Sequence, residues 1–190
     1  MINIQSASVV LTIICVIPIL YLGVKTDLLR EQSPDKTKPN AFSFGRFQLW
    51  IWTLVICPAF ILCWGFSDGI PDINQTSLAL LGIPVSVTVT SAMVATTNEK
   101  ALRKANPGCI PELKQFRESD SFWMDVLIDD KGQLSMGRLQ NLIFTLVMVV
   151  IYISMFIGAD LKQFPDFELN TFVLMGISSA GFVLGKSVMK

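Results

Sequence analysis

Five long stretches of the chain carry no charged residue, and they determine the fold that the sequence predicts. A helix needs roughly 20 apolar residues to cross a hydrocarbon core of about 30 Å, and each stretch is long enough. The predicted transmembrane helices cover about 7–24, 47–66, 78–97, 139–158 and 170–186. We therefore expect residues 1–190 to form one membrane domain, an all-α integral membrane protein with five transmembrane helices.

Two segments that lie far apart in the chain have nearly the same sequence. FSFGRFQLWIWTLV at residues 42–55 returns as LSMGRLQNLIFTLV at residues 134–147, with the Ser-x-x-Arg-x-Gln frame and the Thr-Leu-Val intact. Pro71-Asp72 and Gly82-Ile83 then return as Pro165-Asp166 and Gly176-Ile177. The repeated unit is a helical hairpin that enters the membrane from the same side each time. The sequence therefore predicts one anchor helix plus two parallel-repeat helical hairpins, and a homo-oligomer is the natural extension.

Composition and charge fit this interpretation and add an orientation. Only 16% of the residues are charged, against about a quarter in soluble domains. Every lysine and arginine except Lys162 lies after the first span, between the third and fourth spans, or in the tail, whereas the other two loops are acidic. Because basic loops stay in the cytoplasm, we expect the N-terminus outside and the C-terminus inside.

Several segments also carry a family resemblance: TDLLREQSPDK, FSFGRFQLWIW, LALLGI, SDSFWMDVLIDDKGQLSMGRLQ and LMGISSAGFVLGK. Between about Thr26 and Lys186 the chain resembles a family of small, poorly characterised bacterial integral membrane proteins with a doubled hairpin (an S-x-x-R-x-Q … L-x-G-I-S unit). The first return span departs from it, reading Gly-Ile-Pro-Val instead of Gly-Ile-Ser-Ser. The resemblance implies the fold and a multi-pass location in the bacterial inner membrane, with a periplasmic N-terminus, and implies no activity.

The repeated arginines and glutamines are the first candidate site. Arg46, Gln48, Arg138 and Gln140 lie at the predicted cytoplasmic ends of corresponding spans. One interpretation is an interfacial anchor, in which the arginines reach the lipid headgroups. The other is a cytoplasmic vestibule in an oligomer, which would attract anions.

Small residues in the two return spans form the second candidate site. They are Gly82, Ser86, Thr90, Gly176, Ser178, Ser179, Gly181 and Gly185. Small residues let helix backbones approach closely in lipid, so the first interpretation is a helix-packing face. The alternative is the lining of a narrow pore.

The cytoplasmic segment 98–137 holds the third candidate site. A serine, Ser119 or Ser121, is placed to cap a short amphipathic helix. We expect Phe122, Trp123, Val126 and Leu127 to share one face of that helix and Asp125 to lie elsewhere. Together with Arg117, the aromatic pair Phe122 and Trp123 is a candidate docking face for a cytosolic protein.

The chemistry of catalysis finds little support in this sequence. The chain has no histidine, no C-x-x-C pair and no carboxylate inside a predicted span, so we expect no enzyme, no metal and no cofactor. The expected partners are membrane lipid, further copies of the chain and a cytosolic protein, with no nucleic acid.

These features predict an oligomeric inner-membrane effector or channel-like component that a cytosolic partner controls. The alternative is a non-conducting anchor or scaffold for a soluble complex. A third option is a lipid-headgroup enzyme that uses Asp125, Asp129 and Asp130.

Overall fold

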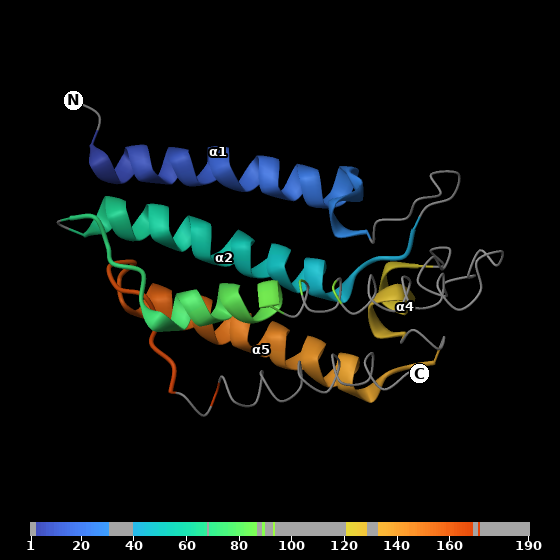
Figure 1. Cartoon of the computed structure of the whole chain (residues 1–190). Helices are drawn as coiled ribbons and strands as arrows, with labels where there is room; N and C mark the ends of the chain where they lie inside the picture. Colours follow the sequence, from blue (N-terminus) through green and yellow to red (C-terminus); the bar gives the residue numbers. More distant parts are fainter. Residues whose placement is uncertain are drawn as a thin grey trace.

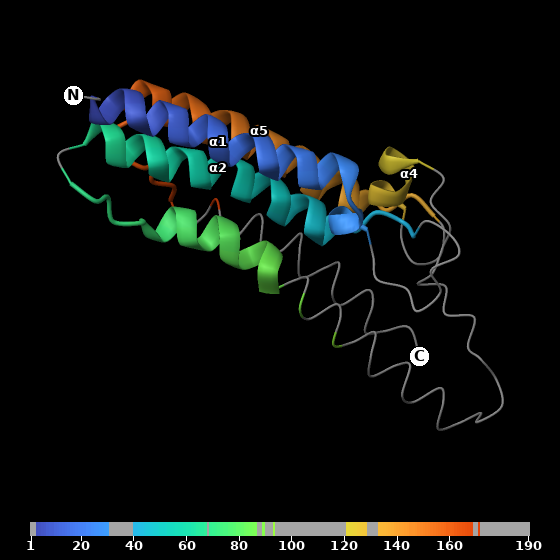
Figure 2. The same cartoon turned by 90° about the horizontal axis from the view of Figure 1, so that it is seen from above.

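The computed structural model describes residues 3–30, 40–67, 69–86, 89, 93, 121–128, 133–168 and 171. All regular structure in these residues is helical, apart from two isolated β-bridges. The elements are α1 (Ile4–Lys25), the 3₁₀ turn η1 (Asp27–Leu29), α2 (Phe44–Phe66), α4 (Phe122–Leu127) and α5 (Met136–Gly158). Residues 75–86 form a further helical segment after α2. Figures 1 and 2 show the long helices side by side, with α4 at one end.

Three helices are long and apolar enough to cross a membrane, namely α1, α2 and α5. This confirms the all-α membrane class and supports a multi-pass protein. Of the predicted span 78–97, the described part up to residue 86 is helical, whereas all of the predicted span 170–186 except Thr171 lies outside the described residues.

The three long helices begin about one turn earlier than we expected. Asn3, Ser43 and Ser135 stand at the N-cap positions, and the side chains of Asn3 and Ser135 accept a backbone N–H of the first turn. Such caps satisfy amide groups that have no partner inside the helix. As a result the polar frame with Arg46 and Arg138 belongs to the first turn of its helix instead of the loop before it.

Helix α1 packs against α2 through its smallest residues. Its two buried residues are Ser8 and Gly23, while most of its large apolar side chains are exposed. A Cβ atom added to Gly65 of α2 would lie 1.9 Å from the Ser8 hydroxyl oxygen, and one added to Gly23 would lie 2.4 Å from Nε1 of Trp50. The Trp50 indole N–H also donates to the carbonyl of Ile19 at 2.9 Å. Close backbone approach is therefore what joins α1 to α2.

The main core lies where α2, α5 and the helical segment 75–86 meet. Large side chains fill it: Trp52, Ile56, Ala59 and Cys63 from α2, Leu80 from the segment, and Met148, Tyr152 and Phe156 from α5. Both α2 and α5 begin at the end of the bundle that carries α4, so they run in the same direction (Figure 1). We call this end the α4 end.

Replacing Gly65 by alanine is expected to destabilise the protein, because the new methyl group would meet the Ser8 side chain. Overpacking of this kind costs about 1–3 kcal/mol. The matched control is Gly158→Ala, since an added Cβ at Gly158 has no neighbour within 4 Å and alanine is favoured over glycine in helices. Thermal unfolding of the detergent-solubilised protein measures both. Equal unfolding midpoints for the two variants would contradict the close contact of α1 with α2.

Candidate functional site at the α4 end

A second cluster of buried apolar side chains closes the α4 end of the bundle. Its buried members are Leu29, Phe44, Phe47, Val126 and Leu142, and half-buried aromatic residues surround them. These residues come from η1, α2, α4 and α5, so the cluster joins segments that are far apart in the sequence. This cluster positions the candidate site residues of the α4 end.

The same backbone contact precedes both α2 and α5. The N–H of Ser43 donates to the carbonyl of Leu29 at 2.8 Å, and the N–H of Ser135 donates to that of Leu127 at 2.9 Å. Each acceptor ends a short sequence of the same kind, Asp27-Leu28-Leu29 or Asp125-Val126-Leu127. This match is not apparent from the sequence, because the spacing from Leu29 to Ser43 differs from the spacing from Leu127 to Ser135.

Helix α4 is capped by its own serine, and Phe122 and Asp125 attach it to the bundle. Its N-cap is Ser121, whose hydroxyl accepts the N–H of Met124. The ring of Phe122 packs edge-on against Phe42 and Phe47, with both centroid distances at 5.0 Å. The carboxylate of Asp125 accepts the backbone N–H of Phe42 at 3.2 Å. The helix is therefore packed against the end of the bundle.

Two side chains of α4 differ from our expectation. Asp125, which we placed away from the packed face, is buried at 4% exposure, and Trp123, which we placed on that face, is 59% exposed. The reason is that α4 has only six residues and packs through positions 122, 125 and 126, one turn apart. The helix itself was predicted correctly, but the side of it that packs on the bundle was predicted wrongly.

Each of the two repeated arginines binds a backbone carbonyl in the segment before its own helix. Arg46 donates to the carbonyl of Leu28 at 3.4 Å, and the buried Arg138 donates to the carbonyl of Ile128. Each arginine therefore binds the segment that leads into its own helix. This is a role that neither the anchor nor the vestibule interpretation had anticipated.

The two repeated glutamines lie in opposite environments. Gln48 is 1% exposed and donates to Thr145 Oγ1 at 2.9 Å and to Asn141 Oδ1 at 3.3 Å. Gln140 is exposed. Gln48 therefore joins α2 to α5, and within one chain the four candidate vestibule residues do not share one kind of environment.

The second candidate site is described only in part. An added Cβ at Gly82 would have no neighbour within 4 Å, and Ser86 is exposed with its hydroxyl donating to the carbonyl of Ile83. The other candidates of this site lie outside the described residues: Thr90, Gly176, Ser178, Ser179, Gly181 and Gly185. Arg117 of the predicted docking face lies outside them as well.

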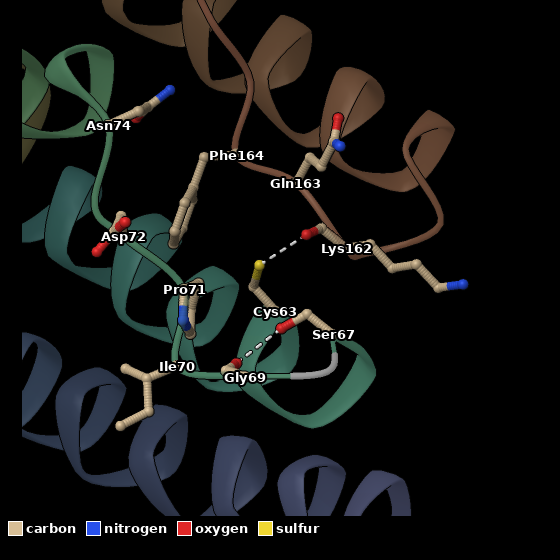
Figure 3. A pocket seen from close by; sticks show the side chains of 10 residues that line it. All are labelled: Cys63, Ser67, Gly69, Ile70, Pro71, Asp72, Asn74, Lys162, Gln163 and Phe164. Atoms are coloured by element: carbon tan, nitrogen blue, oxygen red, sulfur yellow. Dashed lines mark hydrogen bonds between the residues drawn. The ribbon is translucent and has the colours of Figure 1, made fainter.

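A hollow of about 350 Å³ lies at the opposite end of the bundle, where the loops after α2 and α5 meet (Figure 3). The thiol of Cys63 donates to the carbonyl of Lys162 at 3.1 Å, and Figure 3 shows the Lys162 ammonium group pointing away. In the described part of the chain, no group of three or more potential ligands could hold a metal ion.

These same loops hold α2 and α5 together at that end. Asn74 donates to the carbonyl of Pro165 at 2.6 Å, and Thr76 Oγ1 donates to a carboxylate oxygen of Asp166 at 2.8 Å. The hydroxyl groups of Ser77 and Tyr152 lie 3.0 Å apart in the interior. The bundle is thus closed by polar contacts at one end and by the aromatic cluster at the other.

Phe122→Ala is expected to lower stability by more than Trp123→Ala, one residue later. Phe122 loses three edge-to-face aromatic pairs, with Phe42, Phe47 and Trp123, each worth about 0.5–1.5 kcal/mol. Trp123 is largely exposed and loses only its pair with Phe122. Unfolding midpoints of the purified full chain measure both effects. The packing of α4 described above would be wrong if the Trp123 variant were the less stable of the two.

Comparison of the chain with protein-family models, with curated proteins and with solved structures found no match. The family resemblance of the sequence therefore stays a prediction. The function has to be inferred from the contacts and exposed groups of the chain itself.

Proposed function

We propose that this protein is a membrane anchor that holds a cytosolic protein at the bacterial inner membrane. In this proposal five spans, one anchor helix and two parallel hairpins, carry a docking surface at the α4 end. The observation that carries the proposal is the fixed position of α4. Its residues Phe122 and Val126 are packed into the end of the bundle, while Trp123 is left outward and accessible.

The charges at the two ends support the orientation of this anchor. The α4 end carries Arg30, Arg46 and Arg138, whereas the loop after α5 carries Asp160, Asp166 and Glu168 beside Lys162. Since positive residues favour the cytoplasmic side, the α4 end faces the cytosol and the N-terminus of α1 lies in the periplasm.

The chemistry of this surface indicates the kind of partner. A rigidly held tryptophan is a common anchor in protein interfaces, because it buries a large area at little cost in conformational entropy. Arg30 lies over the ring of Phe42 with 4.1 Å from its guanidinium carbon to the ring centroid, and it pairs with the exposed carboxylate of Asp27 at 3.2 Å. Charged groups of both signs therefore lie at this end. The partner is a protein with an apolar pocket for the indole and with polar or charged groups around that pocket.

A channel-like effector is the second candidate, and the open surface at Gly82 and Ser86 favours it. Any conducting path would run between chains, because large side chains fill the core where α2 and α5 meet. A partner bound at Trp123 would act on this path through α4, which contacts both α2 and α5.

Trp123→Ala is expected to abolish capture of the partner, since the exposed indole would be the main contact. The full-length tagged protein is purified from its native membranes, and captured proteins are quantified for the wild type and for each variant. The control is Ile70→Ala, which removes a similarly exposed apolar side chain at the opposite end. An identical set of captured proteins for wild type and Trp123→Ala would refute the docking proposal.

The same preparations distinguish the anchor from the effector. Ion flux into liposomes that contain the purified protein is expected not to exceed that into empty liposomes. A reproducible flux, closed or opened by the captured partner, would replace the anchor by the channel-like effector.

A further inference from the structure

Helices α2 and α5 correspond residue by residue, without a gap. Each has 23 residues and a serine at its N-cap, so Phe44 corresponds to Met136 and Phe66 to Gly158. The correspondence extends beyond the phrase noted in the sequence analysis. It pairs Trp52 with Phe144, Phe60 with Tyr152, Ile61 with Ile153 and Trp64 with Phe156.

Two faces can be defined on both helices from this correspondence. The glutamine face consists of Gln48, Trp52, Val55, Ala59 and Cys63 on α2, and of Gln140, Phe144, Val147, Ile151 and Met155 on α5. The threonine face consists of Leu49, Thr53, Ile56, Phe60 and Trp64 on α2, and of Asn141, Thr145, Met148, Tyr152 and Phe156 on α5. The spacing of three and four residues makes each set one side of a helix.

Within the chain, the glutamine face of α2 packs on the threonine face of α5. Gln48 donates to Thr145, and Trp52 packs edge-on against Tyr152 with 6.3 Å between the ring centroids. The contact is not symmetric, because the other two faces do not meet in return. A contact of this head-to-tail kind leaves one free face on each side.

In the single chain the remaining face of α5 is largely exposed, and the remaining face of α2 is partly accessible. On α5, Gln140 is exposed, and Val147, Ile151 and Met155 are 49%, 40% and 42% exposed. On α2, Ile56 is buried in the main core and Phe60 stacks on Phe164, whereas Trp64 is 39% exposed and Leu49 and Thr53 are half-buried. The accessible part of this face is therefore the strip of Leu49, Thr53 and Trp64. Helix α1 packs on α2 through Trp50 and Gly65, so it does not cover this face.

We propose that a second copy of this chain binds here, with the glutamine face of α5 packed on the threonine face of α2 in the next chain. The amide of Gln140 donates to the Thr53 hydroxyl of that neighbour, as Gln48 donates to Thr145 within the chain. The inference rests on the repeat that the proposed function contains, and it adds which surfaces of the copies meet.

The hydrogen bonds of the two threonines agree with this assignment. Thr145 Oγ1 donates to the carbonyl of Asn141 at 2.8 Å, which leaves its lone pairs to accept the Gln48 amide. Thr53 Oγ1 donates in the same way to the carbonyl of Leu49 at 2.9 Å. Its lone pairs can accept an equivalent amide, and an exposed amide on an apolar membrane helix favours association through such a bond.

The contact between chains is expected to be the weaker of the two. Leu49 stands where Asn141 stands in the internal contact, so the second acceptor of the glutamine amide is missing. Repeating the head-to-tail contact by rotation about the membrane normal closes a ring of chains. Each chain then contributes one glutamine face and one threonine face, and no repeated face is left in lipid.

Disulfide formation between differently tagged chains tests the proposal. The four native cysteines are replaced by alanine, and Gln140→Cys in one tagged chain is co-expressed with Thr53→Cys in the other. The matched control replaces Leu139, the exposed neighbour of Gln140 on a different side of α5. A disulfide-linked pair is expected for Gln140→Cys with Thr53→Cys and not for Leu139→Cys with Thr53→Cys.

Three outcomes would overturn the proposal: equal linkage in both pairs, linkage in neither, or linkage of Gln140→Cys with itself instead of with Thr53→Cys. Gln140→Leu in the otherwise native chain provides a second measurement. Its oligomer fraction, determined by light scattering in detergent, is expected to fall, and an unchanged fraction would count against the contact. Partner capture through Trp123 is measured on the same variant, so a wrong oligomer contact and a wrong docking function give different results.

Discussion

The hydrogen bond from Gln48 to Thr145 determines how the two halves of this protein fit together. In lipid, apolar side chains gain little from facing each other instead of the acyl chains. A buried amide with one good acceptor therefore selects one register among many apolar alternatives. Once Gln48 reaches Thr145 and Asn141, Trp52 falls beside Tyr152, and the filled core toward the far loops follows.

The position of α1 depends on a difference between the halves instead of a likeness. Trp50 of α2 supplies the indole N–H that reaches Ile19, and Gly65 leaves room for Ser8. In α5 the corresponding residues are Leu142 and Ile157, which offer neither a donor nor a gap. A single anchor helix can therefore select α2 although the two helices have the same frame.

The sequence predicted the long helices well because the relevant signals are local. A charge-free run of about 20 residues has few alternatives to a transmembrane helix, and helices α2 and α5 begin only about one turn before such runs, after Ser43 and Ser135. The environments of identical residues could not be predicted in this way. Gln48 and Gln140 stand in the same Gly-Arg-x-Gln frame, yet one is buried and the other exposed, because a second helix covers only the first of them.

The candidate site shows the same limit on a smaller scale. Phe122, Trp123 and Val126 are all apolar, so spacing alone placed them on one face of α4. Asp125 is buried because the backbone N–H of Phe42, from a distant part of the chain, needs an acceptor there. A partner for a buried amide is a requirement of the folded state, and nothing near Asp125 in the sequence signals it.

Contacts at both ends restrict what α2 and α5 can do relative to each other. At the α4 end the aromatic cluster joins them, in the interior Gln48 does, and at the far end the bonds of Asn74 and Thr76 join the loops. Opening a path between the two helices would break all three contacts at once. In the proposed assembly the contact between neighbouring chains lacks one acceptor, so a docked partner would change that contact more easily than the contacts inside a chain. The chain would then keep a fixed fold while the contacts between copies change.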